Sequence, residues 1–175
     1  MRDNDVLQNN SHISRSALEA IHDQVFSWAL SRCNYERAVA EDLVQQTYVE
    51  LLTGKAKFQG RSSLKTFVFS VVQNLARSRF RRVASRIRMV QVMQRNDVEE
   101  FAVTDLPAEH PTLWQAVQNL PQRQRDIIEL VFCRDITIEE ASRVMGVTTG
   151  TGRVHYDRAK KALRVSLANG VENAS

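Results

Sequence analysis

The fold of this chain is decided most clearly between Thr137 and Arg164, a stretch that reads TIEEASRVMGVTTGTGRVHYDRAKKALR. The stretch predicts a short helix, a turn at Gly146 and a longer basic helix, which is the pattern of a helix-turn-helix. In such a motif the second helix enters the major groove of DNA. Four residues of that longer helix recur at steps of three and four, and are expected to share its docking face: Gly152, Tyr156, Ala159 and Leu163.

The remaining side chains of the longer helix are suited to contact with DNA. Thr148 is the expected N-cap, and the hydroxyl and backbone N–H groups at Thr149 and Thr151 can bind phosphate. Arg153 can donate two hydrogen bonds to guanine, and Val154 is expected to face outward, where it can touch a thymine methyl group. The alternative is an ordinary charged surface helix. A small residue, a turn glycine and a capped basic helix occurring together favour the motif.

Charge is distributed unevenly along the 175 residues, whose net charge is +4. Six of the twelve residues 77–88 are Arg, whereas residues 97–109 hold five acidic residues and no Lys or Arg. A solvated helix face is the plainest interpretation of such an Arg run. Its density without balancing acids favours contact with a polyanion.

We expect an all-α fold of two small helical domains joined by a flexible acidic linker. The N-terminal domain, with three or four helices, spans residues 16–93, and the linker spans residues 94–111. The C-terminal four-helix domain, with the helix-turn-helix, spans residues 112–168. Residues 1–15 and 169–175 are expected to be disordered or flexible ends.

Within the N-terminal domain, apolar spacing predicts a first helix over residues 16–31. Asn34 is the expected cap of a second helix, which runs to Leu52 and is stopped by Gly54. After a polar loop, a third helix starts near Ser63 and becomes Arg-rich in its second half.

Within the C-terminal domain, residues 113–119 form a short predicted helix. Pro121 is expected at the first position of the next helix, where its missing N–H costs nothing. That helix carries an apolar run: Ile127, Ile128, Leu130, Val131 and Phe132.

The sequence predicts a protein of the cytoplasm. Residues 1–14 lack the apolar core of a signal peptide, and no stretch approaches the ~20 apolar residues of a membrane span. Cys33 and Cys133 show neither metal spacing nor a disulfide framework, so we interpret both as small buried hydrophobic residues in a reducing compartment. No catalytic residue, metal site or cofactor is predicted.

Two surfaces of the N-terminal domain are candidate binding sites. Phe58, in a flexible polar loop beside the basic helix, can stack on an unpaired base while Arg side chains hold the backbone. Alternatively, Phe58 pins the loop to the core, and composition does not separate the two. The second surface is an acidic and amide-rich helix face, interpreted either as a solvated face or as a protein-docking face: Asp42, Gln45, Gln46 and Glu50.

Three segments resemble the extracytoplasmic-function (ECF) group of bacterial RNA polymerase sigma factors, in the sigma-70 family. Residues 40–48 (AEDLVQQTY) are similar to the polymerase-docking helix of that family. Residues 58–67 (FQGRSSLKTF), continued by residues 73–77 (QNLAR), are similar to the segment that melts and reads the −10 promoter element. Residues 120–164 resemble the domain that reads the −35 element.

The resemblance implies a role for each set of residues. The polymerase-binding set, which would face the clamp helices of the β′ subunit, is Asp42, Gln45, Gln46 and Glu50. The set for −10 DNA, whose loop would hold a flipped base, is Phe58, Gln59, Arg61, Ser62, Ser63, Lys65, Asn74, Arg77, Arg81 and Arg82. The set for −35 DNA is Thr148, Thr149, Thr151, Arg153, Val154, His155, Asp157, Arg158 and Lys160.

The implied function is promoter recognition and strand opening for core RNA polymerase, with contacts to the β′ clamp helices and the β flap. The implied partners are promoter DNA and an anti-sigma factor, expected to be membrane-anchored, which would hold this chain at the inner face of the membrane. Neither a small-molecule substrate nor a stable homo-oligomer is expected.

Two other functions use some of the same residues. A stand-alone helix-turn-helix regulator would bind duplex DNA without polymerase, usually as a dimer, but the chain has no clear dimerisation helix. A nuclease or recombinase would need metal ligands such as Glu41, Asp42 and Glu50. Because the first two are adjacent, they diverge by about 100° on a helix, and no His accompanies them.

The chain departs from the family pattern at four positions. Phe67 stands where Trp is frequent, and both fill a core. Gly152 stands where a β-branched residue is usual, and Ala141 and Ser142 are smaller or more polar than the common pair. A glycine inside a helix costs about 1 kcal/mol relative to Ala. The sequence therefore predicts a loosely packed C-terminal domain, in which Gly152→Val would raise the melting temperature.

Overall fold

The computed structural model describes residues 13–91 and 111–172, which form seven α-helices and one turn of π-helix, without a strand in these ranges. The chain divides into two units, Met1–Thr104 and Asp105–Ser175. The predicted all-α class with two helical domains is confirmed. The acidic linker, most of the N-terminal tail and residues 173–175 lie outside the described residues.

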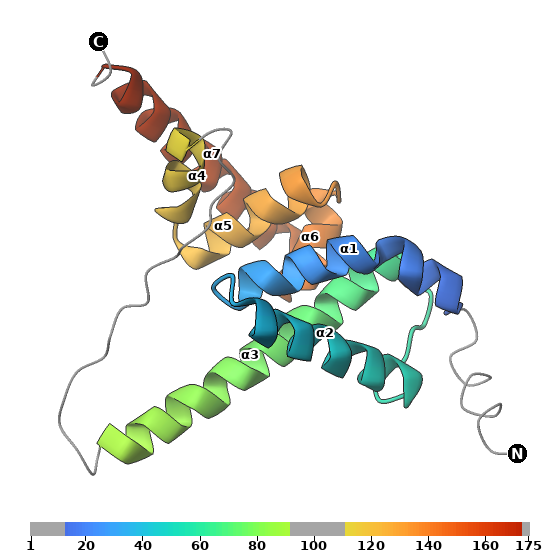
Figure 1. Cartoon of the computed structure of the whole chain (residues 1–175). Helices are drawn as coiled ribbons and strands as arrows, with labels where there is room; N and C mark the ends of the chain where they lie inside the picture. The colour runs from blue at the N-terminus through green and yellow to red at the C-terminus, as the bar shows by residue number, and fades with distance from the viewer. Residues whose placement is uncertain (1–12, 92–110, 173–175) are drawn as a thin grey trace, which may run out of the picture. The chain divides into compact units, whose positions relative to one another are not determined.

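The first unit is a three-helix arrangement of α1 (Arg15–Arg32), α2 (Arg37–Leu52) and α3 (Leu64–Gln91). Figure 1 shows α1 and α2 lying against the N-terminal half of α3, while the C-terminal half of α3 extends beyond them. Trp28 is fully buried between these helices, and its indole N–H donates to the backbone oxygen of Phe69 at 3.2 Å. The fully buried apolar residues of this core include Val25, Trp28, Ala29, Ala40, Val68, Phe69 and Val72.

The helix boundaries of this unit follow local capping, with one correction. The Ser14 hydroxyl accepts from the N–H of Ala17 at the start of α1, and Gly54 has φ +70° just after α2, as a helix-ending glycine should. Asn34 does not cap α2: it has φ 51°, and Glu36 occupies the N-cap position without a side-chain hydrogen bond. Asn tolerates the left-handed conformation that the tight α1–α2 turn requires.

The second unit contains α4 (Pro111–Gln118), α5 (Gln122–Ile128), the π-helical turn η2 (Glu129–Cys133), α6 (Ile138–Met145) and α7 (Thr149–Glu172). Helices α4, α5 and α6 all pack on α7. The buried apolar residues of its core are Ala116, Leu120, Ile127, Ile128, Leu130, Ile136, Ala141, Val144, Met145 and Ala159.

Two predictions for individual residues are wrong, one for Pro121 and one for the two cysteines. Pro121 is the N-cap of α5, one position before its expected place. Phe132 is 63% exposed, because the π-helical turn changes the helical register of the residues that follow Leu130. The same turn leaves Cys133 exposed, and Cys33 is only partly buried, so neither thiol is the buried hydrophobic residue that was expected.

None of the described helices combines the length and the apolar character that crossing a lipid bilayer requires.

Candidate functional site

The helix-turn-helix forms as the sequence predicts, because its turns are capped locally. The Thr137 hydroxyl accepts from the N–H of Glu140, and the Glu140 carboxylate accepts from the N–H of Thr137, which makes a capping box at the start of α6. Gly146 ends α6 with φ 66°. Thr148 caps α7, since its hydroxyl accepts from the N–H of Thr151 at 3.2 Å.

The faces of α7 are divided as a recognition helix requires. Gly152 and Ala159 are buried, and Tyr156 and Leu163 are half-buried, so the predicted docking face is confirmed. The opposite side exposes the polar residues, and Val154 is 47% exposed among them. Of the residues predicted to contact −35 DNA, the exposed ones are Thr148, Thr151, Arg153, Val154, Asp157 and Arg158, and the half-buried ones are Thr149, His155 and Lys160.

An aromatic pair borders this helix, and the sequence interpretation missed it. Tyr156 stacks on Phe132 with ring centroids 6.1 Å apart and planes 15° from parallel. The Lys160 ammonium lies over the Tyr156 ring, 5.2 Å from its centroid. Lys160 is therefore held by a cation–π contact in the chain itself. The register change in η2, which exposes Phe132, left no recognisable signal in the sequence.

Helices α6 and α7 come close together at Gly152, so the expectation of loose packing is wrong. A Cβ atom at position 152 would lie 3.1 Å from Ser142 Cβ and would overlap Ser142 Oγ. Ser142 is buried, and its hydroxyl donates to the backbone oxygen of Ile138 at 2.6 Å. The Ser142 side chain thus fills the space that a side chain at 152 would occupy, and the two departures from the family pattern compensate each other.

In the first unit, the predicted polymerase-docking residues share one groove of about 560 Å³ between α2 and α3. Asp42, Gln45, Gln46 and Glu50 line it from α2. From α3 it is lined by Leu75, Ser78, Arg79 and Arg82. The α2 side is thus acidic and amide-rich, and the α3 side carries two arginines.

One ion pair crosses this groove. Arg79 Nη2 lies 3.8 Å from Asp42 Oδ2, and both side chains are largely exposed. A pair this exposed contributes little to stability. The ion pair matters for recognition, because a partner that contacts Asp42 also meets Arg79. The sequence interpretation did not single out Arg79, because the α2 pattern carries no information about its neighbour on α3.

The loop before α3 is held by hydroxyl groups and by one aromatic contact. Ser63 Oγ accepts from the N–H of Thr66 and lies 2.8 Å from Thr66 Oγ1, which caps α3. Phe58 is half-buried, with its ring centroid 5.2 Å from that of Phe67. Gly60, with φ +68°, forms the bend between them. In this conformation Phe58 does anchor the loop, as one of the two open interpretations proposed.

The predicted −10 residues around the loop and on α3 differ in exposure. Gln59, Arg61, Ser63, Asn74, Arg81 and Arg82 are exposed, whereas Phe58, Ser62, Lys65 and Arg77 are half-buried. Residues 74, 77 and 81 recur at steps of three and four, so they lie along one side of α3. The structure therefore presents the predicted loop and a basic helix side in one unit.

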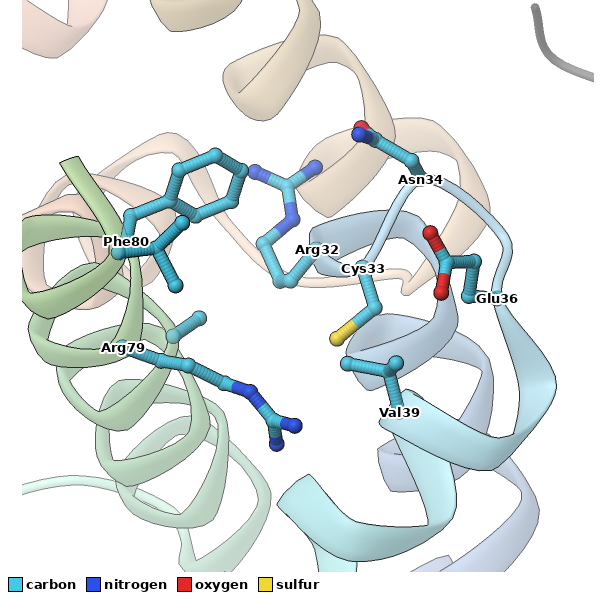
Figure 2. Close-up of a pocket in the computed structure, with 9 residues that line it drawn as sticks. Arg32, Cys33, Asn34, Glu36, Val39, Arg79 and Phe80 are labelled. Atoms are coloured by element: carbon cyan, nitrogen blue, oxygen red, sulfur yellow. The ribbon is translucent and has the colours of Figure 1, made fainter. Parts of the chain in front are cut away.

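A second depression of about 240 Å³ lies between the α1–α2 turn and α3. Figure 2 shows the Cys33 side chain pointing into it beside Val39, with Phe80 and Arg79 on the α3 side. Phe80 is 59% exposed there. Partial burial raises the pKa of the Cys33 thiol. Cys133 in the second unit is exposed as a residue, but partial desolvation of its thiol raises the pKa of that group as well. Neither cysteine belongs to a predicted site.

No group of three or more His, Cys, Asp or Glu residues in the described ranges is arranged to hold a metal ion. Glu41 is paired with Arg37 at 2.9 Å on the same helix, and Asp42 is paired with Arg79. The acidic residues of α2 thus form separate surface pairs. Taken together, the two helical units and the exposed basic helix define a DNA-binding protein of the helix-turn-helix class.

Comparison with known proteins identifies the family. The model of sigma-70 region 2 matches residues 17–86, and the model of sigma-70 region 4 matches residues 111–163. The chain therefore belongs to the sigma-70 family of RNA polymerase sigma factors, in its ECF group. Members of this family are transcription initiation factors that are not themselves enzymes.

Individual relatives agree with this assignment at low sequence identity. The ECF RNA polymerase sigma factor EcfG of Rhodopseudomonas palustris is 27% identical, over 73% of this chain and 71% of the relative. The ECF RNA polymerase sigma factor SigF of Caulobacter vibrioides is 26% identical, over 94% of this chain and 92% of the relative.

Solved structures show the same fold. The sigma factor RpoE of Bartonella quintana, in complex with the anti-sigma factor NepR, has a TM-score of 0.69 at 22% identity, over 88% of this chain and 96% of that one. CnrH, in complex with the cytosolic domain of CnrY, has a TM-score of 0.60 at 20% identity, over 95% of this chain and 97% of that one.

Proposed function

We propose that this chain brings core RNA polymerase to promoters by reading the −35 element with its second unit and the −10 element with its first. The observation that carries the proposal is the match of regions 2 and 4 to the two units, together with the exposed basic face of α7. The chain supplies recognition and capture of unpaired bases, and the polymerase supplies the chemistry.

In the first unit, the α2–α3 groove is the proposed docking site for the clamp helices of the β′ subunit. Its α2 side offers carboxylate and amide acceptors from Asp42, Gln45, Gln46 and Glu50, and Val49 lines it with 47% exposure. Polar groups around an apolar centre are the usual composition of a protein–protein interface. The second unit is the proposed partner of the β flap.

The loop over residues 58–63 is the proposed site for a flipped −10 base, with Asn74 on α3 nearby. Phe58 supplies an aromatic surface for stacking, and its contact with Phe67 sets the position of that surface. Lys65, Arg77, Arg81 and Arg82 are the proposed backbone contacts. Strand opening is then driven by the capture of bases as they unstack, at a cost of a few kcal/mol per flipped base.

The exposed face of α7 is the proposed reader of the −35 duplex. Thr148, Thr149 and Thr151 lie at the helix N-terminus, where hydroxyl and N–H groups fix phosphate. Arg153, Val154, His155, Asp157 and Arg158 face the groove. Lys160 contributes at the edge of this surface, where it also covers Tyr156.

An anti-sigma factor is the proposed regulator. The sigma factor RpoE, which shares the fold of this chain, was solved in complex with the anti-sigma factor NepR. We place this chain in the cytoplasm, held at the inner face of the membrane when its anti-sigma factor is membrane-anchored. Binding to the α2–α3 groove would block the polymerase.

A gel-shift assay on promoter DNA, with and without core polymerase, tests the proposal. We expect a stable specific complex only when core polymerase and this chain are both present. Tight specific binding by the chain alone, as a dimer on a palindrome, would support the stand-alone regulator instead. A variant with Asp42→Lys should lose the complex, while Asp23→Lys on the exposed side of α1 should keep it.

A further inference from the structure

One acidic side chain lies in the middle of the exposed, basic face of α7. Asp157 follows Arg153 and Val154 by one helical turn, and Lys160 and Lys161 follow it by another. Despite these cations, the Asp157 side chain makes no hydrogen bond or ion pair with any side chain that the structure describes. Its carboxylate is exposed and unpaired.

A carboxylate in this position is unfavourable beside DNA unless it meets a hydrogen-bond donor. The phosphates around the groove are negatively charged, and non-specific binding depends on neutralising them. A residue that served only phosphate contact would not be acidic at the centre of this face. Among the edges of the bases, the donors in the major groove are the amino groups of cytosine and adenine.

These two bases differ in what lies beside the amino group. Adenine places the N7 acceptor next to the N6 amino group, and the lone pair on N7 repels a carboxylate. Guanine presents two acceptors and thymine presents one acceptor and a methyl group. Cytosine presents only the N4 donor, so it is the base that suits an acceptor-only side chain.

We propose that Asp157 is a specificity-determining residue that selects a cytosine in the −35 element by accepting a hydrogen bond from its N4 amino group. This inference rests on the proposed function, since it assigns a base to one side chain of the proposed −35 reader. It differs from a helix-stabilising role, because Asp157 and Lys161 share the favourable spacing but are not paired in the structure.

The test is a competition for duplexes with a randomised −35 element, bound by core polymerase with the full chain and read by sequencing. We expect the unsubstituted chain to prefer cytosine at one position by roughly 5- to 150-fold, the range of a good side-chain–base contact. Asp157→Ala should remove most of that preference and leave the other positions unchanged. Asp157→Asn should shift the preference toward adenine, since Asn bonds both N6 and N7.

The matched control is Asp135→Asn, which removes the same charge from an exposed residue of the same unit. Asn tolerates the φ of 51° at this position, and the cytosine preference should persist. Thermal unfolding of each variant confirms that α7 remains folded.

Two results would overturn the inference in distinguishable ways. If Asp157→Ala strengthens binding to all sequences equally and leaves every base preference intact, the carboxylate acts only through its charge, and the proposed function stands. If the polymerase complex with the unsubstituted chain shows no −35 preference at any position, the proposed function itself fails, and the assignment of Asp157 fails with it.

Discussion

Replacing Gly152 with Ala should destabilise the second unit, although Ala is the better helix former. The gain in helix propensity is about 1 kcal/mol. Against it, the new methyl group would overlap Ser142 Oγ and stand 3.1 Å from Ser142 Cβ. Overpacking of this kind costs about 1–3 kcal/mol. We therefore expect a net loss of up to about 2 kcal/mol in the free energy of unfolding.

Ser142→Ala should reverse the sign of that effect. Removing the hydroxyl eliminates the overlap, and the remaining approach of the two Cβ atoms requires a shift of only a few tenths of an ångström between α6 and α7. In this background, Gly152→Ala should be neutral or stabilising by about 1 kcal/mol. The double-mutant cycle should give a coupling free energy of about 1–2 kcal/mol: the variant with Ala at both positions should be more stable by this amount than the sum of the two single changes. This value lies within the range for residues in contact.

Urea denaturation followed by NMR measures the cycle, because resolved amide signals of α6 and α7 report the second unit separately from the first. A coupling of 1 kcal/mol corresponds to a melting-temperature change of about 4–8 °C for a unit of this size. If Gly152→Ala is equally stabilising with Ser and with Ala at position 142, the close approach is refuted. The second unit would then be loosely packed after all.

Other perturbations address the binding surfaces and the thiols. Asp42→Lys should weaken the affinity for core polymerase at least about tenfold, a loss of about 1.4 kcal/mol in binding free energy, while the melting temperature stays unchanged. Fluorescence anisotropy measures this affinity. An equal loss of affinity in Asp23→Lys would show a non-specific charge effect. Arg81→Ala should lower promoter affinity about uniformly across sequences and reduce the salt slope by about 1, and a sequence-dependent loss would contradict a phosphate contact. Because burial raises the pKa of the Cys33 and Cys133 thiols, both should remain protonated at pH 7.5. They should therefore be alkylated more slowly than free cysteine, and the alkylation rates should rise as the pH increases. Rapid alkylation at neutral pH would contradict this expectation.

The features that could be predicted from the sequence are those that depend on residues close together along the chain. The capped turn at Gly146 and Thr148 follows from hydrogen bonds within a few residues, and the docking face of α7 follows from helical periodicity. The stop at Gly54 is equally local. The α2 face of Asp42 and its neighbours was also predictable as one surface, although the roles of its residues stay predictions.

Features that depend on contacts between elements could not be predicted. Asn34 suits both a helix cap and a left-handed turn, and only the short α1–α2 connection decides between them. The vacancy inferred at Gly152 is filled by Ser142 from another helix, and Arg79 reaches the α2 groove from α3. The π-helical turn that exposes Phe132 is a change of register without a characteristic residue pattern.

Run-off transcription with sequencing of RNA 5′ ends tests the central claim most directly. Core polymerase is mixed with this chain on a fragmented bacterial genome, and core polymerase alone is the control. We expect start sites that appear only with the chain and that share a two-part motif at one fixed spacing, one part for each helical unit. RNA that starts at the same places without the chain, or no RNA despite a formed complex, would contradict the account.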